Sequence, residues 1–193
     1  MAMQNLHKIN IKWNLQDPEM LNDEELYRIF NEWISDSCEE VLIDVADYKH
    51  LKHGPTTILI GHEANYFLES EDQTKGLVYA RKQTQEGDLS TRLTATLRAS
   101  LQGCIKLENH PELQGRLKFD GSKVRFTAND RLHAPNTKNN VQLFEQYLSP
   151  ILDTIFSPNS YTFDNEKKTS ERLTVIVQTS STADLSNLFK KLT

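Results

Sequence analysis

The sequence predicts an α+β fold in which a mostly antiparallel sheet, built from meanders and hairpins, is packed by three main helices and a short C-terminal helix. Two observations predict it. Several short stretches alternate apolar and polar residues, which is the period of a half-buried strand. Three longer stretches repeat apolar residues every three or four positions, which is the period of a helix packed on one side. We expect a single domain over residues 1–193, with a possible subdivision near 83–88.

The N-terminal elements are predicted from local patterns. Residues 9–15 alternate apolar side chains with lysine and asparagine, which predicts a strand with one buried face. A helix over residues 23–36 should follow, with Asn22 as its N-cap and Glu25 as the capping-box partner.

Residues 41–67 combine strand-like apolar runs with the densest set of titratable side chains. Residues 41–43 are apolar on both alternating faces, which predicts a central strand covered on both sides. A second strand should begin at residues 58–60, and a third at 77–82.

The second helix should begin after Asp88 and end before Pro111, because proline disfavours helical geometry in the preceding residue. Within it, Ala95, Ala99 and Gly103 repeat every four residues. This row of small residues favours close packing against the sheet or another helix. A ligand lying against the row is the alternative.

Residues 116–128 are predicted to form a hairpin about a central Asp-Gly pair, which is a strong turn signal. That register places Lys118 opposite Lys123 and Arg116 opposite Arg125. Like charges directly opposite one another are unfavourable, so something must offset them. Solvent and acidic side chains from elsewhere are one explanation, and an anionic ligand or partner is the other.

The C-terminal part predicts a third helix, a second hairpin and a short helix. Asn136 or Thr137 should cap the third helix, and Pro150 should kink or split it. The hairpin should span residues 161–177 with a loose turn at 165–170, and Ser181 should cap the final helix.

Composition excludes some classes of protein. The net charge of −5 argues against a general nucleic-acid binder, whose surface would be basic. No apolar run approaches the ~20 residues of a membrane span, and the N-terminus lacks a signal-peptide core, so we expect a cytoplasmic location. Cys38 and Cys104 lie far apart, and Cys104 is expected to be a buried free thiol.

The common catalytic motifs are absent. The candidates that remain for acid–base chemistry are His62, Glu63, Asp44 and Asp130. His62 lies at a strand end beside Gly61, where an imidazole can act as a general base. For each residue a structural role is the competing explanation. A histidine whose ring is hydrogen-bonded within the fold is common in proteins, and so is a carboxylate that is solvated or paired.

Metal and cofactor sites are not expected. Asp44, Asp47, His50 and His53 recur every three residues, but a strand points such residues to opposite faces. A second polar set follows the predicted hairpin and includes Asn129, Arg131 and His133, which join the basic hairpin residues as candidate binding groups.

The segments LIDVADY, GP…LIGHEAxY and NDRLHAPNT resemble those of a family of uncharacterised bacterial proteins of similar length. The resemblance extends over most of the chain. It implies no activity and assigns no catalytic residue.

These observations favour a binding or protein-interaction module that recognises a small anionic ligand or a protein partner and that could form a homo-oligomer. The alternative is an acid–base or metal-assisted hydrolase centred on His62. A third hypothesis is a structural subunit that docks through its C-terminal helix.

Overall fold

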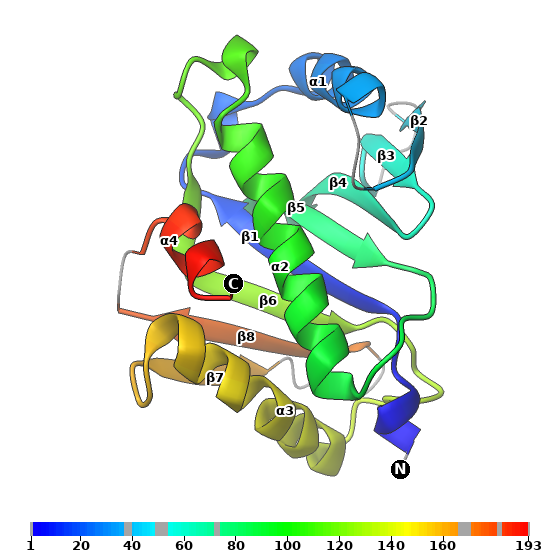
Figure 1. Ribbon diagram of the computed structural model, residues 1–193, viewed down its shortest axis with the longest axis vertical. Coiled ribbons are helices and arrows are strands. Elements are labelled where there is room, and N and C mark those ends of the chain that lie inside the picture. The colour runs from blue at the N-terminus through cyan, green and yellow to red at the C-terminus, as the bar shows by residue number, and fades with distance from the viewer. Residues whose placement is uncertain are drawn as a thin grey trace.

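The computed structural model describes residues 2–36, 40–48, 54–71, 74–165, 171–180 and 183–192, and Figure 1 shows their arrangement. These residues form an α+β fold, in which one eight-stranded antiparallel sheet is combined with four α-helices. The predicted fold class is therefore confirmed. The prediction of a single domain, with a possible subdivision near 83–88, stays a prediction.

The strands follow the order β2-β3-β4-β5-β1-β6-β8-β7 across the sheet, so β2 and β7 form its edges. Their bounds are β1 (Ile9–Leu15), β2 (Leu42–Asp47), β3 (Thr57–Gly61), β4 (Ala64–Glu71), β5 (Thr74–Arg81), β6 (Phe119–Ala128), β7 (Tyr161–Asn165) and β8 (Leu173–Thr179).

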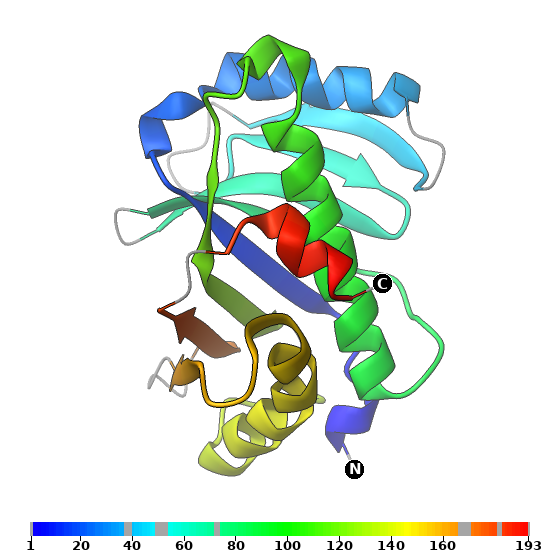
Figure 2. The ribbon, with the colours of Figure 1, turned by 60° about the vertical axis from the view of Figure 1, so that its left-hand side comes forward.

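The helices all cover the same face of the sheet (Figures 1 and 2). Helix α1 packs on β2 and β3, α2 on β5 and β1, and α3 on β7 and β8, while α4 lies against α2 and α3. Their bounds are α1 (Asp23–Asp36), α2 (Leu89–Glu108), α3 (Lys138–Phe156) and α4 (Leu185–Lys190), and short 3-10 turns occupy Ala2–Asn5, Pro18–Met20 and Pro111–Leu113.

Strand β1 lies inside the sheet, between β5 and β6. As its alternation predicts, Ile9, Ile11 and Trp13 are fully buried. They belong to one hydrophobic cluster that extends from Val45 on β2 to Val177 on β8. The core is therefore the layer between the sheet and its helices.

Local capping chemistry fixes the start of α1. The Asn22 side-chain oxygen accepts a hydrogen bond from the Glu25 backbone N–H at 2.9 Å, and the Glu25 carboxylate accepts one from the Asn22 N–H at 3.1 Å. This reciprocal pair is the capping box that the sequence predicts.

Helices α2 and α3 also begin where predicted. The Asp88 carboxylate accepts from the Thr91 N–H at 2.8 Å, and the Thr137 hydroxyl accepts from the Asn140 N–H at 3.3 Å. Helix α3 runs unbroken through Pro150, so a split at this residue is wrong, while a kink there stays a prediction.

The prediction that residues 41–45 form a central strand is wrong, because β2 is an edge strand. Val41 is 66% exposed and Ile43 is 56% exposed. The register with β3 shifts between Leu42 and Asp44, which makes Ile43 a bulge residue. The apolar run is therefore not a sign of burial on both faces.

One strand is missing from the sequence prediction. Residues 57–71 form two antiparallel strands, β3 and β4, joined by a tight turn at His62 and Glu63. The turn follows Gly61, where a Cβ would lie 2.6 Å from the Ala64 carbonyl oxygen. The glycine lets the two strands approach closely at the point where the chain reverses.

The predicted hairpin at residues 116–128 is also wrong. Phe119–Ala128 is a single strand that pairs with β1 on one side and β8 on the other. Asp120 accepts hydrogen bonds from both the N–H and the hydroxyl of Ser122, which shapes an irregularity within the strand. A Cβ at Gly121 would lie 1.9 Å from the carbonyl oxygen of Ala183, so glycine is needed for the chain crossing there.

The remaining C-terminal predictions are partly tested. Asp184, and not Ser181, caps α4, because its carboxylate accepts from the Ser186 N–H. Ser181 and residues 166–170 lie outside the described residues. Cys104 is buried as a free thiol, as predicted, and Cys38 lies outside the described residues.

Candidate functional site

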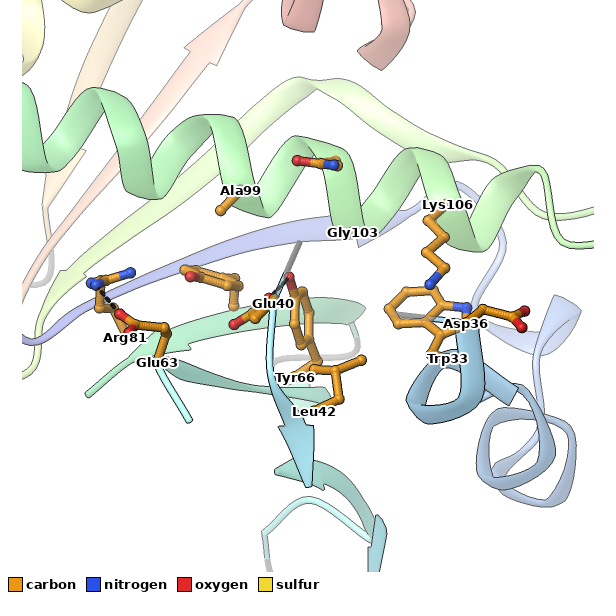
Figure 3. A pocket seen from close by; sticks show the side chains of 12 residues that line it. Trp33, Asp36, Glu40, Leu42, Glu63, Tyr66, Arg81, Ala99, Gly103 and Lys106 are labelled. Atoms are coloured by element: carbon orange, nitrogen blue, oxygen red, sulfur yellow. Dashed lines mark hydrogen bonds and ion pairs between the residues drawn. The ribbon is translucent and has the colours of Figure 1, made fainter. Parts of the chain in front are cut away.

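A pocket of about 450 Å³ lies between α2 and the helix-covered face of β4 and β5, and we call it the α2 pocket. In Figure 3, Glu63 and Arg81 lie at one end, Trp33, Asp36 and Lys106 lie at the other, and Glu40 and Tyr66 lie between them. The lining residues are Trp33, Asp36, Glu40, Leu42, Glu63, Tyr66, Tyr79, Arg81, Ala99, Gln102, Gly103 and Lys106.

The small residues Ala99 and Gly103 of α2 line one side of this pocket. A Cβ at Gly103 would lie 2.5 Å from the Tyr66 ring, well inside an ordinary carbon–carbon contact. The predicted close packing of this row is confirmed at Gly103. One turn earlier, Ala99 faces the pocket and leaves it open (Figure 3).

The tyrosines of β4 and β5 form an aromatic wall with Trp33. The Tyr66 ring makes edge-on contacts with Trp33 and Tyr79, at centroid distances of 5.8 and 5.0 Å. Burial raises the pKa of Tyr79 to about 12 and the pKa of Tyr66 well above its ordinary value. Both phenols are therefore protonated at neutral pH.

Glu40 is the acidic group at the centre of the α2 pocket. The Tyr66 hydroxyl donates a hydrogen bond to its carboxyl oxygen at 2.9 Å. Burial raises the pKa of Glu40 above its ordinary value, and the Tyr66 hydrogen bond and the Arg81 charge oppose that rise only in part. Burial therefore makes Glu40 harder to ionise than a carboxyl group in water, and a positive charge beside it would favour the ionised form.

The basic residues of the pocket already contact groups of the protein. Arg81 forms an ion pair with Glu63. The Lys106 ammonium lies 4.8 Å from the centroid of the Trp33 ring, which is the geometry of a cation–π contact. The pocket can therefore hold polar and cationic groups against an aromatic wall.

The residues proposed for acid–base catalysis do not converge. His62 is exposed on the β3–β4 turn, where its backbone N–H donates to the Val41 carbonyl at 2.7 Å, and Asp44 is exposed on the edge strand. Strands β4, β5 and β1 separate the end of β3 from the end of β6, which amounts to about 19 Å across the sheet. Of the four candidates, only Glu63 lines the α2 pocket.

Asp130 has a local structural role. Its carboxylate accepts from the Leu132 and His133 backbone N–H groups and pairs with the His133 ring at 2.9 Å. The hydrogen bond to His133 lowers the pKa of Asp130. Asn129 continues the sheet, because its N–H donates to the Lys8 carbonyl at 2.8 Å.

The proposed basic binding residues are not arranged as a hairpin face, since the hairpin does not exist. Acidic partners offset them instead: Arg116 pairs with Glu25, Lys118 lies 3.4 Å from Glu108, and Arg125 pairs with Glu69. Lys123 is half-buried on β6, and Arg131 is exposed in the loop after it. The pairs agree with the explanation that acidic side chains neutralise these charges.

The described ranges contain no group of three or more histidine, cysteine or acidic residues placed to hold a metal ion. His50 and His53 lie outside them, so the three-residue series cannot be followed beyond Asp47. Within the same ranges, no helix is both long enough and apolar enough to cross a membrane.

Sequence reasoning missed most of the α2 pocket. Glu40, Tyr66 and Arg81 are brought together only by the order of the strands, and Lys106 only by the placement of α2. The one available signal was the row of small residues that includes Ala99 and Gly103, for which a ligand was the alternative explanation.

Comparison with known proteins adds no relative. No protein-family model matches the chain, and neither does any curated protein. The resemblance carried by residues 41–66 and 129–137 therefore stays a prediction.

Proposed function

We propose that this protein is a binding module whose α2 pocket takes a small polar ligand. The observation that carries the proposal is the half-buried Glu40, whose carboxyl group accepts a hydrogen bond from the Tyr66 hydroxyl inside a pocket of about 450 Å³. Ligand sites are typically concave, of this size, and lined by aromatic side chains with a few convergent polar groups.

Other parts of the proposal rest on the sequence alone. They are a cytoplasmic location, a bacterial origin, recognition of a protein partner and assembly into a homo-oligomer. The hydrolase centred on His62 gains no support from the geometry, because His62 lies outside the α2 pocket.

The test is ligand screening by thermal unfolding, because a ligand that binds only the folded state raises the melting temperature. A panel of small cations, anions and neutral aromatic compounds would be screened, and hits would be checked by tryptophan fluorescence, to which both Trp13 and Trp33 contribute. Ala99→Phe should abolish the effect, since this residue faces the pocket.

Ala95→Phe is the matched control. Ala95 lies one turn earlier on α2, is half-buried like Ala99 and does not line the pocket. Hits that stabilise the Ala99→Phe and Ala95→Phe variants equally bind elsewhere, and that result would overturn the proposed function.

A further inference from the structure

We infer that this protein forms a two-fold symmetric homodimer, in which two copies pack through the sheet face that none of the described helices covers (Figures 1 and 2). The inference gives a surface to the proposed homo-oligomer. It goes beyond ligand binding, because the α2 pocket lies on the helix-covered face. The surface is the apolar part of the open face on β2, β3, β4 and β5, and we call it the open-face patch. Its residues are Ala46, Ile58, Ile60, Phe67, Val78 and Ala80.

The strand register places this patch on the side of the sheet opposite the core. Lys12 points away from the core, because its neighbours Ile11 and Trp13 are buried in it. Residues paired across neighbouring strands share a face. The pairs Lys12–Val78, Val78–Phe67, Phe67–Ile58 and Ile58–Ala46 therefore form one row across the open face.

The core cluster confirms this assignment. Among the described residues, the cluster includes Leu77 and Tyr79 but leaves out Val78 between them. It likewise includes Leu59 but neither Ile58 nor Ile60. The open-face patch is therefore a second apolar surface, separate from the core.

The two halves of the open face differ in composition. On β1, β6 and β8 its positions are mostly polar, as expected for a sheet face in contact with water. On β3 and β5, residues 58–60 and 77–80 are apolar or aromatic at every position, which is typical of strands covered on both faces. This half of the sheet thus has the sequence of a covered surface. The polar positions are Asn10, Lys12, Asn14, Lys123, Thr127, Thr174 and Gln178.

The charges beside the patch favour a second copy as its cover. Asp44 is exposed on the β2 side. Lys82 follows β5 on the other side, where its ammonium lies 2.9 Å from the Asn65 side-chain oxygen. A two-fold axis parallel to the strands and between β3 and β4 places β2 of one copy over β5 of the other. Each Asp44 then lies on the side of the partner's Lys82, and Ile58 packs against the partner's Phe67.

The size of the patch fits a dimer of modest affinity. Four strands about 4.8 Å apart and about five residues long give a flat area of about 320 Å² on each copy. Side chains project from this plane, so the accessible area is larger. Two copies would bury at least about 650 Å², whereas standard stable interfaces bury about 1,200–2,000 Å². We therefore expect a reversible dimer, which closes at two copies because both use the same surface.

Sedimentation velocity of the full chain, from micromolar to near-millimolar concentration, measures this association. We expect the average mass to rise from one chain toward two. Ile58→Lys places a charge inside the patch and should raise the dissociation constant about tenfold or more. Ile176→Lys is the matched control, because Ile176 is half-buried on the open face of β8, outside the patch. Circular dichroism checks that both variants fold.

A charge exchange tests the two-fold arrangement. Asp44→Lys and Lys82→Glu each bring like charges together across the axis, so each should weaken the dimer by about threefold. The double variant recreates opposite charges and should restore the affinity. A role of either residue within its own chain would not produce this restoration.

A chain that stays monomeric over the whole range would overturn the inference and leave the patch to a different protein. A dimer that persists unchanged in Ile58→Lys would also overturn it, as would equal weakening by Ile176→Lys or a double charge variant no better than the single ones. The proposed function is tested separately, because Ala99→Phe and Ala95→Phe report on the opposite side of the sheet.

Discussion

Replacing Gly103 by alanine sets two measurable effects against each other. Alanine in a helix interior is more favourable than glycine by about 1 kcal/mol, so propensity alone predicts a more stable protein. The added Cβ would lie 2.5 Å from Cε1 and 3.2 Å from Cδ1 of Tyr66. Ordinary carbon contacts are about 3.5 Å or longer, so the ring would have to move by about 1 Å.

Tyr66 has little room for this movement. It is 6% exposed and packs edge-on against both Trp33 and Tyr79. Overpacking of this kind costs about 1–3 kcal/mol. With the helix gain subtracted, we expect Gly103→Ala to lower the free energy of unfolding by about 1 kcal/mol.

Urea unfolding followed by circular dichroism measures this change, provided that the slope against urea concentration is unaltered. The control is the same substitution in a Tyr66→Ala background, where the clash is absent. There Gly103→Ala should raise the free energy of unfolding by about 1 kcal/mol, which gives a coupling energy of about 2 kcal/mol. Stabilisation of equal size in both backgrounds would refute the reasoning.

Three further predictions concern charged groups. Because the pKa of Glu40 is raised in the folded state, its contribution to stability is present at low pH and is lost as pH rises through the folded pKa. The stability advantage of Glu40→Gln should therefore grow with pH in urea titrations and then level off, and a constant difference would contradict this. Glu69 contacts the buried Lys12 at 3.2 Å, so Glu69→Gln should cost about 2 kcal/mol in urea unfolding. Glu112→Gln, which breaks a pair with an exposed arginine, should cost less than about 1 kcal/mol, and equal losses would argue against a buried role for Glu69. Asp88→Ala should lower the midpoint of thermal unfolding, because the N-cap hydrogen bond is lost, whereas Asp88→Asn should retain most of the cap; a full loss in both would exclude capping as the cause.

The helices could be predicted from the sequence because their signals are local. The apolar stripe and the Asn22–Glu25 capping box lie within one stretch of chain, and the structure places α1 at the predicted bounds. The same holds for Asp88 at the start of α2. No distant contact is needed to decide where these helices begin.

The sheet could not be predicted to the same extent, because long-range pairing overrides local turn signals. Asp120 and Gly121 have the composition of a hairpin turn, yet β6 continues through them between β1 and β8. Likewise, an apolar run such as residues 41–45 is compatible with either a central or an edge strand. Its place depends on the order of all eight strands.

The candidate site could not be predicted from the sequence, because it too depends on long-range packing. Glu40, Tyr66 and Lys106 are separated by at least one secondary-structure element along the chain and meet only after the sheet and α2 have assembled. Their individual sequence contexts are ordinary. A pocket of this type becomes visible only when the packing of α2 on β4 and β5 is known.

The bulge at Ile43 affects how easily the edge strand β2 could pair with the same strand of another molecule. An edge strand offers unpaired backbone groups to any passing strand, and exposed apolar side chains such as Val41 and Ile43 increase that hazard. The shifted register between Leu42 and Asp44 interrupts the regular ladder that a second chain would need. The carboxylates of Asp44 and Asp47 add like charge wherever two such edges meet. The sheet thus ends at β2 with a built-in barrier to open-ended growth into fibres.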